Sequence, residues 1–140
     1  MEFYYLCDII ISTKGKNMYY INDKEYKCTV AVTLDIFNDR WKLAIIWHLL
    51  DGEKRFKDLH EIISEITQKT LTVKLKELEE KNIIHREVYA EVPPKVVYSL
   101  TDAGKNLKSV LEEMHKWGIN YVQEFGKITP ENQCVVNTCK

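Results

Sequence analysis

The hydrophobic pattern of this chain changes from helical to strand-like spacing at Asn82. Before Asn82, apolar side chains recur at the spacing that is typical of α-helices. After it, residues 84–88 and 96–100 alternate, or nearly alternate, between apolar and polar, as strands do. Pro93 and Pro94 lie between these two runs, and because two prolines cannot sit inside a central strand, they mark the tip of a two-stranded ribbon. The pattern therefore predicts several helices followed by one β-ribbon.

The helical part divides into four predicted helices, at residues 30–37, 40–50, 56–66 and 68–81. Thr29 and Thr67 suit N-caps of the first and the fourth helix. The predicted helix ends are Asn38-Asp39, Asp51-Gly52 and, in the left-handed conformation that asparagine tolerates, Asn82. Apolar residues face almost every direction of helix 40–50, which indicates a buried central helix. The apolar faces of the other two long helices are Phe56, Leu59, Ile62, Ile63 and Ile66, and Leu71, Leu75 and Leu78.

A long final helix is predicted after the ribbon, capped by Thr101-Asp102. One side of it carries an apolar stripe, formed by Ala103, Leu107, Val110, Leu111, Met114, Trp117 and Tyr121. Helices, a hairpin and a last helix in this order predict a mainly α winged helix-turn-helix domain with a small β-ribbon. The stripe is longer than the core of such a domain can cover, which favours a two-fold dimer; the alternative is that it folds back onto its own domain.

Composition sets bounds on the class of protein. The chain has 140 residues, 45% of them hydrophobic, which is enough for one domain with a core. It holds no apolar run near the ~20 residues of a membrane-spanning helix. Residues 1–13 lack the basic start and the cleavage site of a signal peptide, so we expect a cytoplasmic protein with no membrane partner. The net charge of −1 taken alone argues against a nucleic-acid partner, so the local placement of the lysines decides.

The predicted helix 68–81 has the features of a DNA-recognition helix. On a helical wheel its leucines form one stripe, and Lys69, Thr72, Val73 and Lys76 project from the opposite side. Three lysines, Lys69, Lys74 and Lys76, lie in its first nine residues, which contain no acid, and the acids follow; the helix dipole disfavours this order. Recognition helices present their N-terminal residues to bases and phosphates, so this order suits DNA binding. The charge pattern alone fits a solvated helix face equally well.

The predicted contacts with double-stranded DNA come from this helix and from the ribbon. Lys95 lies beside the Pro93-Pro94 tip and Arg86 on the first strand, where a wing could reach phosphates, although Glu87 and Glu91 dilute the positive charge. The predicted DNA-binding residues are Gln68, Lys69, Thr70, Thr72, Val73, Lys76, Arg86 and Lys95.

No enzymatic chemistry is predicted. The four histidines show no spacing of metal ligands, and we interpret each as a core or surface residue: His48, His60, His85 and His115. The chain has no glycine-rich phosphate loop and no arrangement typical of nucleophilic or carboxylate catalysis, so we expect no catalytic residue, metal or cofactor. The alternative to a DNA-binding regulator is a winged-helix module for protein–protein interaction that does not bind DNA.

The run from Cys28 to Trp117 resembles the HxlR family of winged-helix transcriptional regulators, which is related in fold to MarR. The residues that carry the resemblance are Cys28, Arg40-Trp41-Lys42, Leu49-Leu50-Asp51-Gly52, Arg55-Phe56, residues 71–79, Arg86, residues 93–96, residues 98–101, Gly104 and Trp117-Gly118. Two departures are Asn38-Asp39 and Asn82, where members usually carry glycine. Because asparagine keeps access to positive φ, these departures do not threaten the fold.

The resemblance implies a homodimer, joined through the N-terminal segment and the long C-terminal helix, with paired recognition helices in successive major grooves. It also implies autoregulation or control of a neighbouring gene. Some members respond to electrophiles or oxidants through the N-terminal cysteine that Cys28 matches, so an electrophile or other small-molecule inducer is expected, of unknown identity. We expect an N-terminal extension at 1–27, a DNA-binding and dimerisation domain at 28–126 and a tail at 127–140.

The position of Cys28 in the sequence also favours redox sensing. It precedes a predicted helix, where the helix dipole favours a thiolate, and Lys24 and Lys27 lie nearby in the chain. Cys28 of one subunit could form a disulfide with Cys134 or Cys139 of the other. The alternative is a buried, inert cysteine, which is how free cysteines usually occur.

Overall fold

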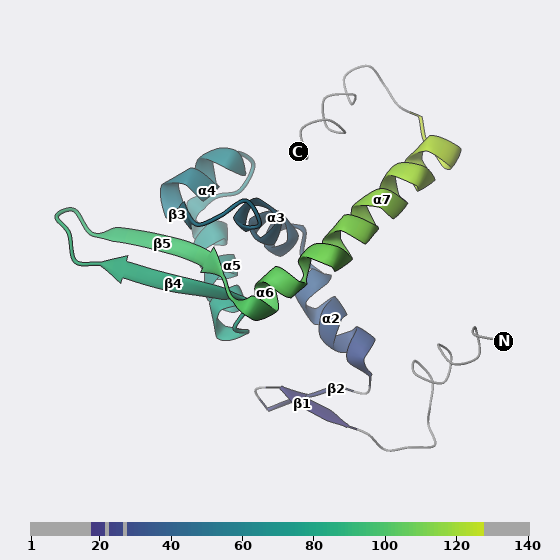
Figure 1. Cartoon of the computed structure of the whole chain (residues 1–140), viewed down its shortest axis with the longest axis horizontal. Coiled ribbons are helices and arrows are strands. Elements are labelled where there is room, and N and C mark those ends of the chain that lie inside the picture. The colour runs from purple at the N-terminus through teal and green to yellow at the C-terminus, as the bar shows by residue number, and fades with distance from the viewer. Residues whose placement is uncertain (1–17, 22, 27, 128–140) are drawn as a thin grey trace.

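Three helices pack around one apolar core beside a three-stranded sheet (Figure 1). These helices are α3 (Arg40–Leu49), α4 (Phe56–Ile62) and α5 (Gln68–Glu80). The computed structural model describes residues 18–21, 23–26 and 28–127. The largest fully buried side chains are Ile45, Ile46, Leu59, Leu71, Leu75, Leu78 and Ile84. The fold is a winged helix-turn-helix, as the sequence predicts.

The predicted helices 40–50 and 68–81 are confirmed within one residue at their C-terminal ends. Thr67 caps α5 by accepting a hydrogen bond from the backbone N–H of Thr70 at 3.2 Å. Asn82 lies just beyond α5 with φ of +55°, which is the left-handed conformation expected there. The central helix α3 buries Ile45, Ile46 and Leu49, and its remaining apolar side chains pack partly buried against the same core.

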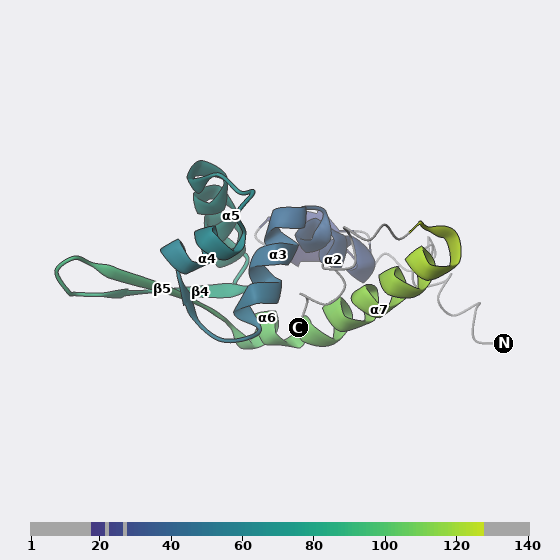
Figure 2. The ribbon, with the colours of Figure 1, turned by 90° about the horizontal axis from the view of Figure 1, so that it is seen from above.

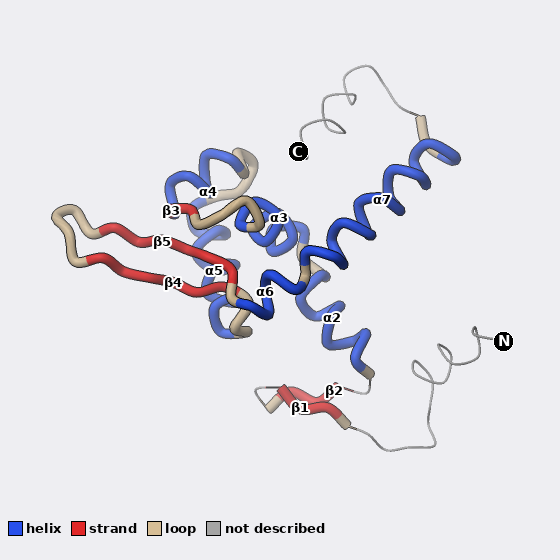
Figure 3. The backbone as a smooth tube through the Cα atoms, viewed as in Figure 1, coloured by secondary structure: helices blue, strands red, loops and turns tan. Residues whose placement is uncertain are grey.

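The predicted ribbon is confirmed, and the sheet gains one short strand from the helical part of the chain. Strands β4 (Ile84–Tyr89) and β5 (Lys95–Leu100) form an antiparallel hairpin that extends away from the helices (Figures 1 and 3). Strand β3 (Lys54–Arg55) pairs with β5 on its other side. Because β5 is the central strand, the neighbouring residues Val97 and Tyr98 are both buried, and the strict alternation expected from the sequence fails there.

The predicted helix 56–66 is wrong at its C-terminal end, because α4 stops at Ile62. Ile63 leaves the helical conformation, with φ of −95° and ψ of 65°, and the chain then turns. This turn buries both Ile63 and Ile66, whereas Ile62, the last residue of α4, is 45% exposed. Burial of Ile63 and Ile66 thus accompanies the early end of the helix.

The predicted single helix after the ribbon is two helices, α6 (Asp102–Asn106) and α7 (Lys108–Phe125). Thr101 caps the first of them by accepting a hydrogen bond from Gly104 N–H at 3.1 Å. The same hydroxyl donates a hydrogen bond to the backbone oxygen of Asn82 at 2.7 Å, which ties α6 to the turn that follows α5. At Leu107 the backbone N–H bonds to the oxygens of Gly104 and Lys105, so the regular i to i−4 pattern is interrupted there.

Gly104 is required by a close approach of two backbones. A Cβ atom at this position would lie 2.2 Å from the backbone oxygen of Ile83. The residue therefore lets α6 lie directly on the start of β4, and from there α7 projects away from the ribbon (Figure 2).

The N-terminal part holds a hairpin that the sequence does not predict. Strands β1 (Tyr19–Ile21) and β2 (Lys24–Tyr26) pair antiparallel ahead of helix α2 (Thr29–Phe37). The prediction of Thr29 as N-cap is wrong by one residue: Thr29 lies in the helix, and the Cys28 Sγ accepts a hydrogen bond from Ala31 N–H at 3.4 Å. Tyr26 is buried and donates a hydrogen bond to Asp35 of α2 at 2.8 Å, so the hairpin is held to the domain.

Candidate nucleic-acid interface

Helix α5 presents a polar face to solvent because its apolar face is fully used by the core. Leu71, Leu75 and Leu78 are buried among residues of α3, α4 and the sheet. Four of the predicted contact residues lie on the opposite side and are exposed: Lys69, Thr72, Val73 and Lys76. Gln68 is exposed at the first position of the helix, and Thr70 is half-buried. Thr70 and Thr67 share a hydrogen bond between their hydroxyls at 2.8 Å, which occupies both at the N-terminus of the helix. The helix can thus offer amide, ammonium, hydroxyl and methyl groups to a groove.

Lys74 does not belong to this exposed face. Its Nζ lies 2.8 Å from Asp39 Oδ2 and 3.1 Å from Glu77 Oε1, and its side chain is 19% exposed. These carboxylates, Asp39 first, raise the pKa of Lys74. The three lysines in the first nine residues of α5 therefore separate into two on the outer face, Lys69 and Lys76, and one that is paired within the protein. Lys76 lies 3.8 Å from Glu80, an exposed pair that contributes little stability.

The ribbon places its two predicted contact residues differently. Arg86 is exposed in the middle of β4, opposite Tyr98 of β5. Lys95 is half-buried, and its Nζ lies 4.9 Å from the centre of the Tyr89 ring, a cation–π contact. Tyr89 in turn donates a hydrogen bond to Glu87 at 3.1 Å, which raises the pKa of its hydroxyl. Arg86 therefore offers its charge to solvent, whereas Lys95 is oriented by its own strand pair.

Two further cations, Arg55 and Lys57, lie beside the wing. They are not among the contacts predicted from the sequence. Pairing of β3 with β5 places Arg55 opposite Val97, and α4 begins at the next residue. Arg55 and Lys57 are exposed and line a hollow of ≈ 400 Å³ together with the tip prolines and Lys95. The signal in the sequence was Arg55 at the start of a predicted helix, but only the pairing with β5 brings this residue to the wing.

Cys28 is partly exposed at the start of α2. Its sulfur accepts the hydrogen bond from Ala31 N–H, so it lies at the positive end of the helix dipole, as expected. Lys24 does not lie free beside it: the Lys24 Nζ is bound to Asp35 at 2.6 Å. Lys27, Cys134 and Cys139, which also enter the redox prediction, lie outside the described residues.

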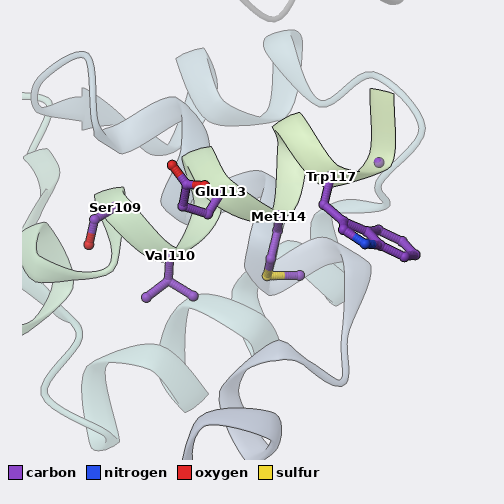
Figure 4. Close-up of a pocket in the computed structure, with 6 residues that line it drawn as sticks. Ser109, Val110, Glu113, Met114 and Trp117 are labelled. Carbon is purple, nitrogen blue, oxygen red and sulfur yellow. The ribbon is translucent and has the colours of Figure 1, made fainter. Parts of the chain in front are cut away.

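The apolar stripe of the C-terminal helix is mostly exposed. Leu111 is buried and Leu107 packs against the core, but beyond them the stripe leaves the domain. Trp117 is 66% exposed and stacks on Tyr121 at 4.9 Å, and Tyr121 contacts Phe125 at 5.0 Å. Val110, Met114 and Trp117 line an open groove of ≈ 850 Å³ along α7 (Figure 4). Beyond Leu111, the stripe therefore does not fold back onto its own domain within the described residues of α7.

The remaining titratable residues form no metal site in the described part of the chain, where no three histidine, cysteine or acidic side chains cluster. His48 is half-buried, and burial lowers its pKa. His115 lies against Trp47, with ring centres 5.7 Å apart. No helix in the described ranges is long and apolar enough to cross a membrane.

Comparison with known proteins places this geometry in context. The model of the HxlR-like helix-turn-helix family matches residues 36–125. The HTH-type transcriptional regulator YdeP of Bacillus subtilis is 45% identical over 109 residues, which cover 78% of this chain and 85% of YdeP. YybR of the same organism, also an HTH-type transcriptional regulator, is 47% identical over 106 residues, or 76% of this chain and 82% of YybR.

Solved structures show the same similarity. The redox regulator HypR in its oxidised form is 46% identical, with a TM-score of 0.62 over 66% of this chain and 96% of HypR. The reduced form of the transcriptional regulator YodB from B. subtilis is 38% identical, with a TM-score of 0.58 over 71% of this chain and 95% of YodB. YodB is also known in a quinone-bound and in a diamide-treated form.

Proposed function

The chain belongs to the family of HxlR-like helix-turn-helix proteins, and from this premise we propose that it binds its operator through α5, with the wing on the flanking phosphates. Proteins of this family are transcriptional regulators, and this chain is a sequence-specific DNA-binding transcriptional regulator, not a protein-interaction module without DNA affinity. The observation that carries the assignment of α5 is its division into a leucine face held by the core and an exposed face of Gln68, Lys69, Thr72, Val73 and Lys76.

The proposed contacts divide by the groups that they offer. Lys69 and Lys76, with Arg86 on the wing, reach phosphates or guanine edges as cations. Gln68 offers hydrogen bonds to base edges, and the exposed methyl groups of Val73 suit the methyl of thymine. The Thr72 hydroxyl donates to the backbone oxygen of Gln68 at 2.8 Å, so it is left to accept a hydrogen bond from a base edge. Thr70 and Lys95 are partly occupied within the protein, so we assign them supporting contacts. Arg55 and Lys57 join the set as phosphate contacts beside the wing.

Selection of bound fragments from genomic DNA by the purified protein gives the operator, and salt titration on that fragment tests the assignment of α5. We expect the Lys69→Ala/Lys76→Ala double variant to lose operator affinity by about tenfold to a hundredfold. Its plot of log affinity against log salt should be shallower, by about 1 per removed phosphate contact. Fluorescence anisotropy of the labelled fragment measures both quantities.

The matched control is Lys105→Ala/Lys108→Ala, which removes the same charge from exposed positions on α6 and α7. It should leave the salt dependence and the affinity nearly unchanged. Unaltered affinity in the α5 double variant would remove α5 from the interface.

We also propose that the regulator is a homodimer that uses the exposed stripe of α7 together with the N-terminal segment. Large apolar side chains are exposed on both: Val110, Met114, Trp117, Tyr121, Val122 and Phe125 on α7, and Met18, Tyr19, Tyr20, Ile21, Val30 and Leu34 on the hairpin and α2. A soluble monomer rarely exposes so extended a set, and two-fold symmetry would match a palindromic operator. Residues 28–126 would form the DNA-binding and dimerisation domain. Since its target is DNA, we place the protein in the cytoplasm and assign it no catalytic role.

Cys28 is the proposed sensing thiol. Its support is its partial exposure and its place at the first turn of α2, together with similarity to a protein named as a redox regulator. In the proposed reaction two thiols lose two protons and two electrons to an oxidant such as diamide, and a disulfide forms between Cys28 of one subunit and Cys134 or Cys139 of the other. An electrophile such as a quinone would instead add to the thiolate.

Treatment with diamide should change the operator affinity of the wild-type protein by about tenfold, within the range of typical coupling energies. The Cys28→Ser variant should not respond, and its untreated affinity should equal that of the wild type. Anisotropy before and after treatment, followed by dithiothreitol, measures the effect. An equal response in both proteins would place the sensing thiol elsewhere, and no response in either would refute thiol regulation.

A further inference from the structure

Helix α5 has a third side, which neither enters the leucine core nor faces solvent. Lys74, Glu77 and Lys81 lie at intervals of three and four residues along the helix and its C-cap, so they share one flank. This flank faces α2 and α3. Their charges alternate along the helix, positive, negative and positive.

Each of these three side chains meets a residue of opposite charge on α2 or at α3. Lys74 Nζ lies 2.8 Å from Asp39 Oδ2, and Lys42 Nζ lies 2.8 Å from Glu77 Oε2. Lys81 Nζ is bound to Asp35 Oδ2. The charges of the partners therefore alternate in the opposite order, negative, positive and negative. These three contacts are the flank ion pairs: Asp39–Lys74, Lys42–Glu77 and Asp35–Lys81.

The flank ion pairs are partly withdrawn from solvent. The side chain of Lys42 is only 8% exposed. Among the residues that the structure describes, Lys42 is the one charged residue that is buried. The hydrogen bond from Lys42 lowers the pKa of Glu77, and hydrogen bonds from Lys24 and Lys81 lower that of Asp35, so the acids are ionised at neutral pH. Lysine is rarely buried, because removing its charge from water costs more than most pairs return.

These pairs are therefore expected to add little to the free energy of folding. Their stronger effect is on the position of α5 against α2 and α3. Hydrophobic burial is non-directional, so the leucine face defines the position of α5 along its axis less sharply than paired charges do. The flank ion pairs favour one axial position. A slide of α5 by one turn in either direction would bring Lys74 or Lys81 opposite Lys42, and would bring Glu77 towards Asp35 or Asp39. Each such shift replaces attraction by repulsion between poorly solvated charges.

We propose that the flank ion pairs set the axial position and rotation of the recognition helix, so that Lys42, Lys74, Glu77 and Lys81 determine operator specificity without touching DNA. They are positioning residues, and the inference rests on the proposed role of α5 in base contact. Discrimination between sequences depends on holding side chains within about 0.5 Å of the geometry that contacts base edges, whereas affinity for any DNA depends on charge near phosphates.

Comparison of Lys74→Met with Lys69→Met tests the proposal, because the two variants lose the same group from the same helix. Lys74→Met should lose about tenfold or more in affinity for the selected operator, equivalent to one lost base contact, and little for a scrambled fragment of equal length. Its salt dependence should match the wild type. Lys69→Met should weaken binding to both fragments and make the salt dependence shallower by about 1 per half-site.

The outcomes separate the inference from the function on which it rests. A shallower salt dependence in Lys74→Met would mean that Lys74 contacts phosphate, and an unchanged operator affinity would mean that it positions nothing; either overturns the inference. If Lys69→Met binds both fragments as the wild type does, the assignment of α5 itself fails, and the positioning role fails with it.

A second variant excludes a purely structural effect. Lys42→Met/Glu77→Leu replaces the buried pair by apolar side chains of similar size, a change that is often neutral or stabilising. We expect an unchanged or raised midpoint of thermal unfolding together with a loss of about tenfold in the ratio of operator to scrambled-fragment affinity. A stable variant with the wild-type ratio would overturn the inference.

Discussion

Trp117→Glu is expected to convert the proposed dimer into a monomer and to weaken operator binding by about a hundredfold to ten-thousandfold. The indole is 66% exposed and stacks on Tyr121, in the middle of the α7 stripe. In a dimer it would be buried, and a carboxylate in its place would have to lose water without a partner. A dimer that binds one half-site holds its second subunit at a high effective concentration near the other half-site. A monomer loses this gain in affinity.

Sedimentation at micromolar protomer concentration measures the first effect, and anisotropy on the full operator and on a single half-site measures the second. Affinity for the half-site should be nearly unchanged, because α5 lies in another part of the fold. Asn120→Glu is the matched control: it adds the same charge to an exposed position of α7 outside the stripe. A wild-type monomer, or a Trp117→Glu variant that sediments as a dimer, would remove α7 from the interface.

The elements that could be predicted from sequence are those whose signals are local. Helix α5 has a capping threonine, leucines at helical spacing and a left-handed asparagine at its end, and all three signals agree. The wing tip is equally local, because two prolines exclude a central strand wherever they lie. The exposed face of α5 follows from the same helical spacing, so Lys69, Thr72, Val73 and Lys76 could be assigned to it from the sequence alone.

What the sequence could not predict depends on partners far along the chain. The break at Leu107 and the early end of α4 reflect how the following segment packs, and an apolar repeat continues through both without change. The hairpin at residues 19–26 has too few residues for a periodic signal. Arg55 joins the candidate interface only because β3 pairs with β5, more than forty residues later.

Charge pattern was the least reliable guide, and Lys74 shows why. The order of charges along the chain groups it with Lys69 and Lys76, whereas the helical wheel leaves it outside their face. A position beside the leucine stripe does not distinguish solvent from a neighbouring helix. The distinction depends on Asp39, which both caps α3 through Trp41 N–H at 2.9 Å and binds Lys74. Lys42 is hidden in the same way, as a cation inside a helix that is otherwise largely apolar.

Leu75→Ala should lower the free energy of unfolding by about 2–5 kcal/mol, the largest stability effect that we expect from one substitution on α5. Leu75 lies between Leu71 and Leu78 on the buried face, and all three contact the one core that α3, α4 and the sheet share. Loss of its side chain leaves a cavity that these elements can fill only by moving α5, and α5 cannot move freely because its flank is paired with α2 and α3.

Urea denaturation followed by circular dichroism, at one fixed protomer concentration, gives the change in free energy, since a dimer's apparent stability depends on concentration. Val73→Ala is the control on the same helix: its side chain is 45% exposed, so it should change stability by no more than about 0.5 kcal/mol. It should nevertheless weaken operator binding if Val73 meets a thymine methyl. The two variants should thus separate the two faces of α5, one lowering stability and the other affinity. A cost for Leu75→Ala no larger than that for Val73→Ala would contradict the core assignment.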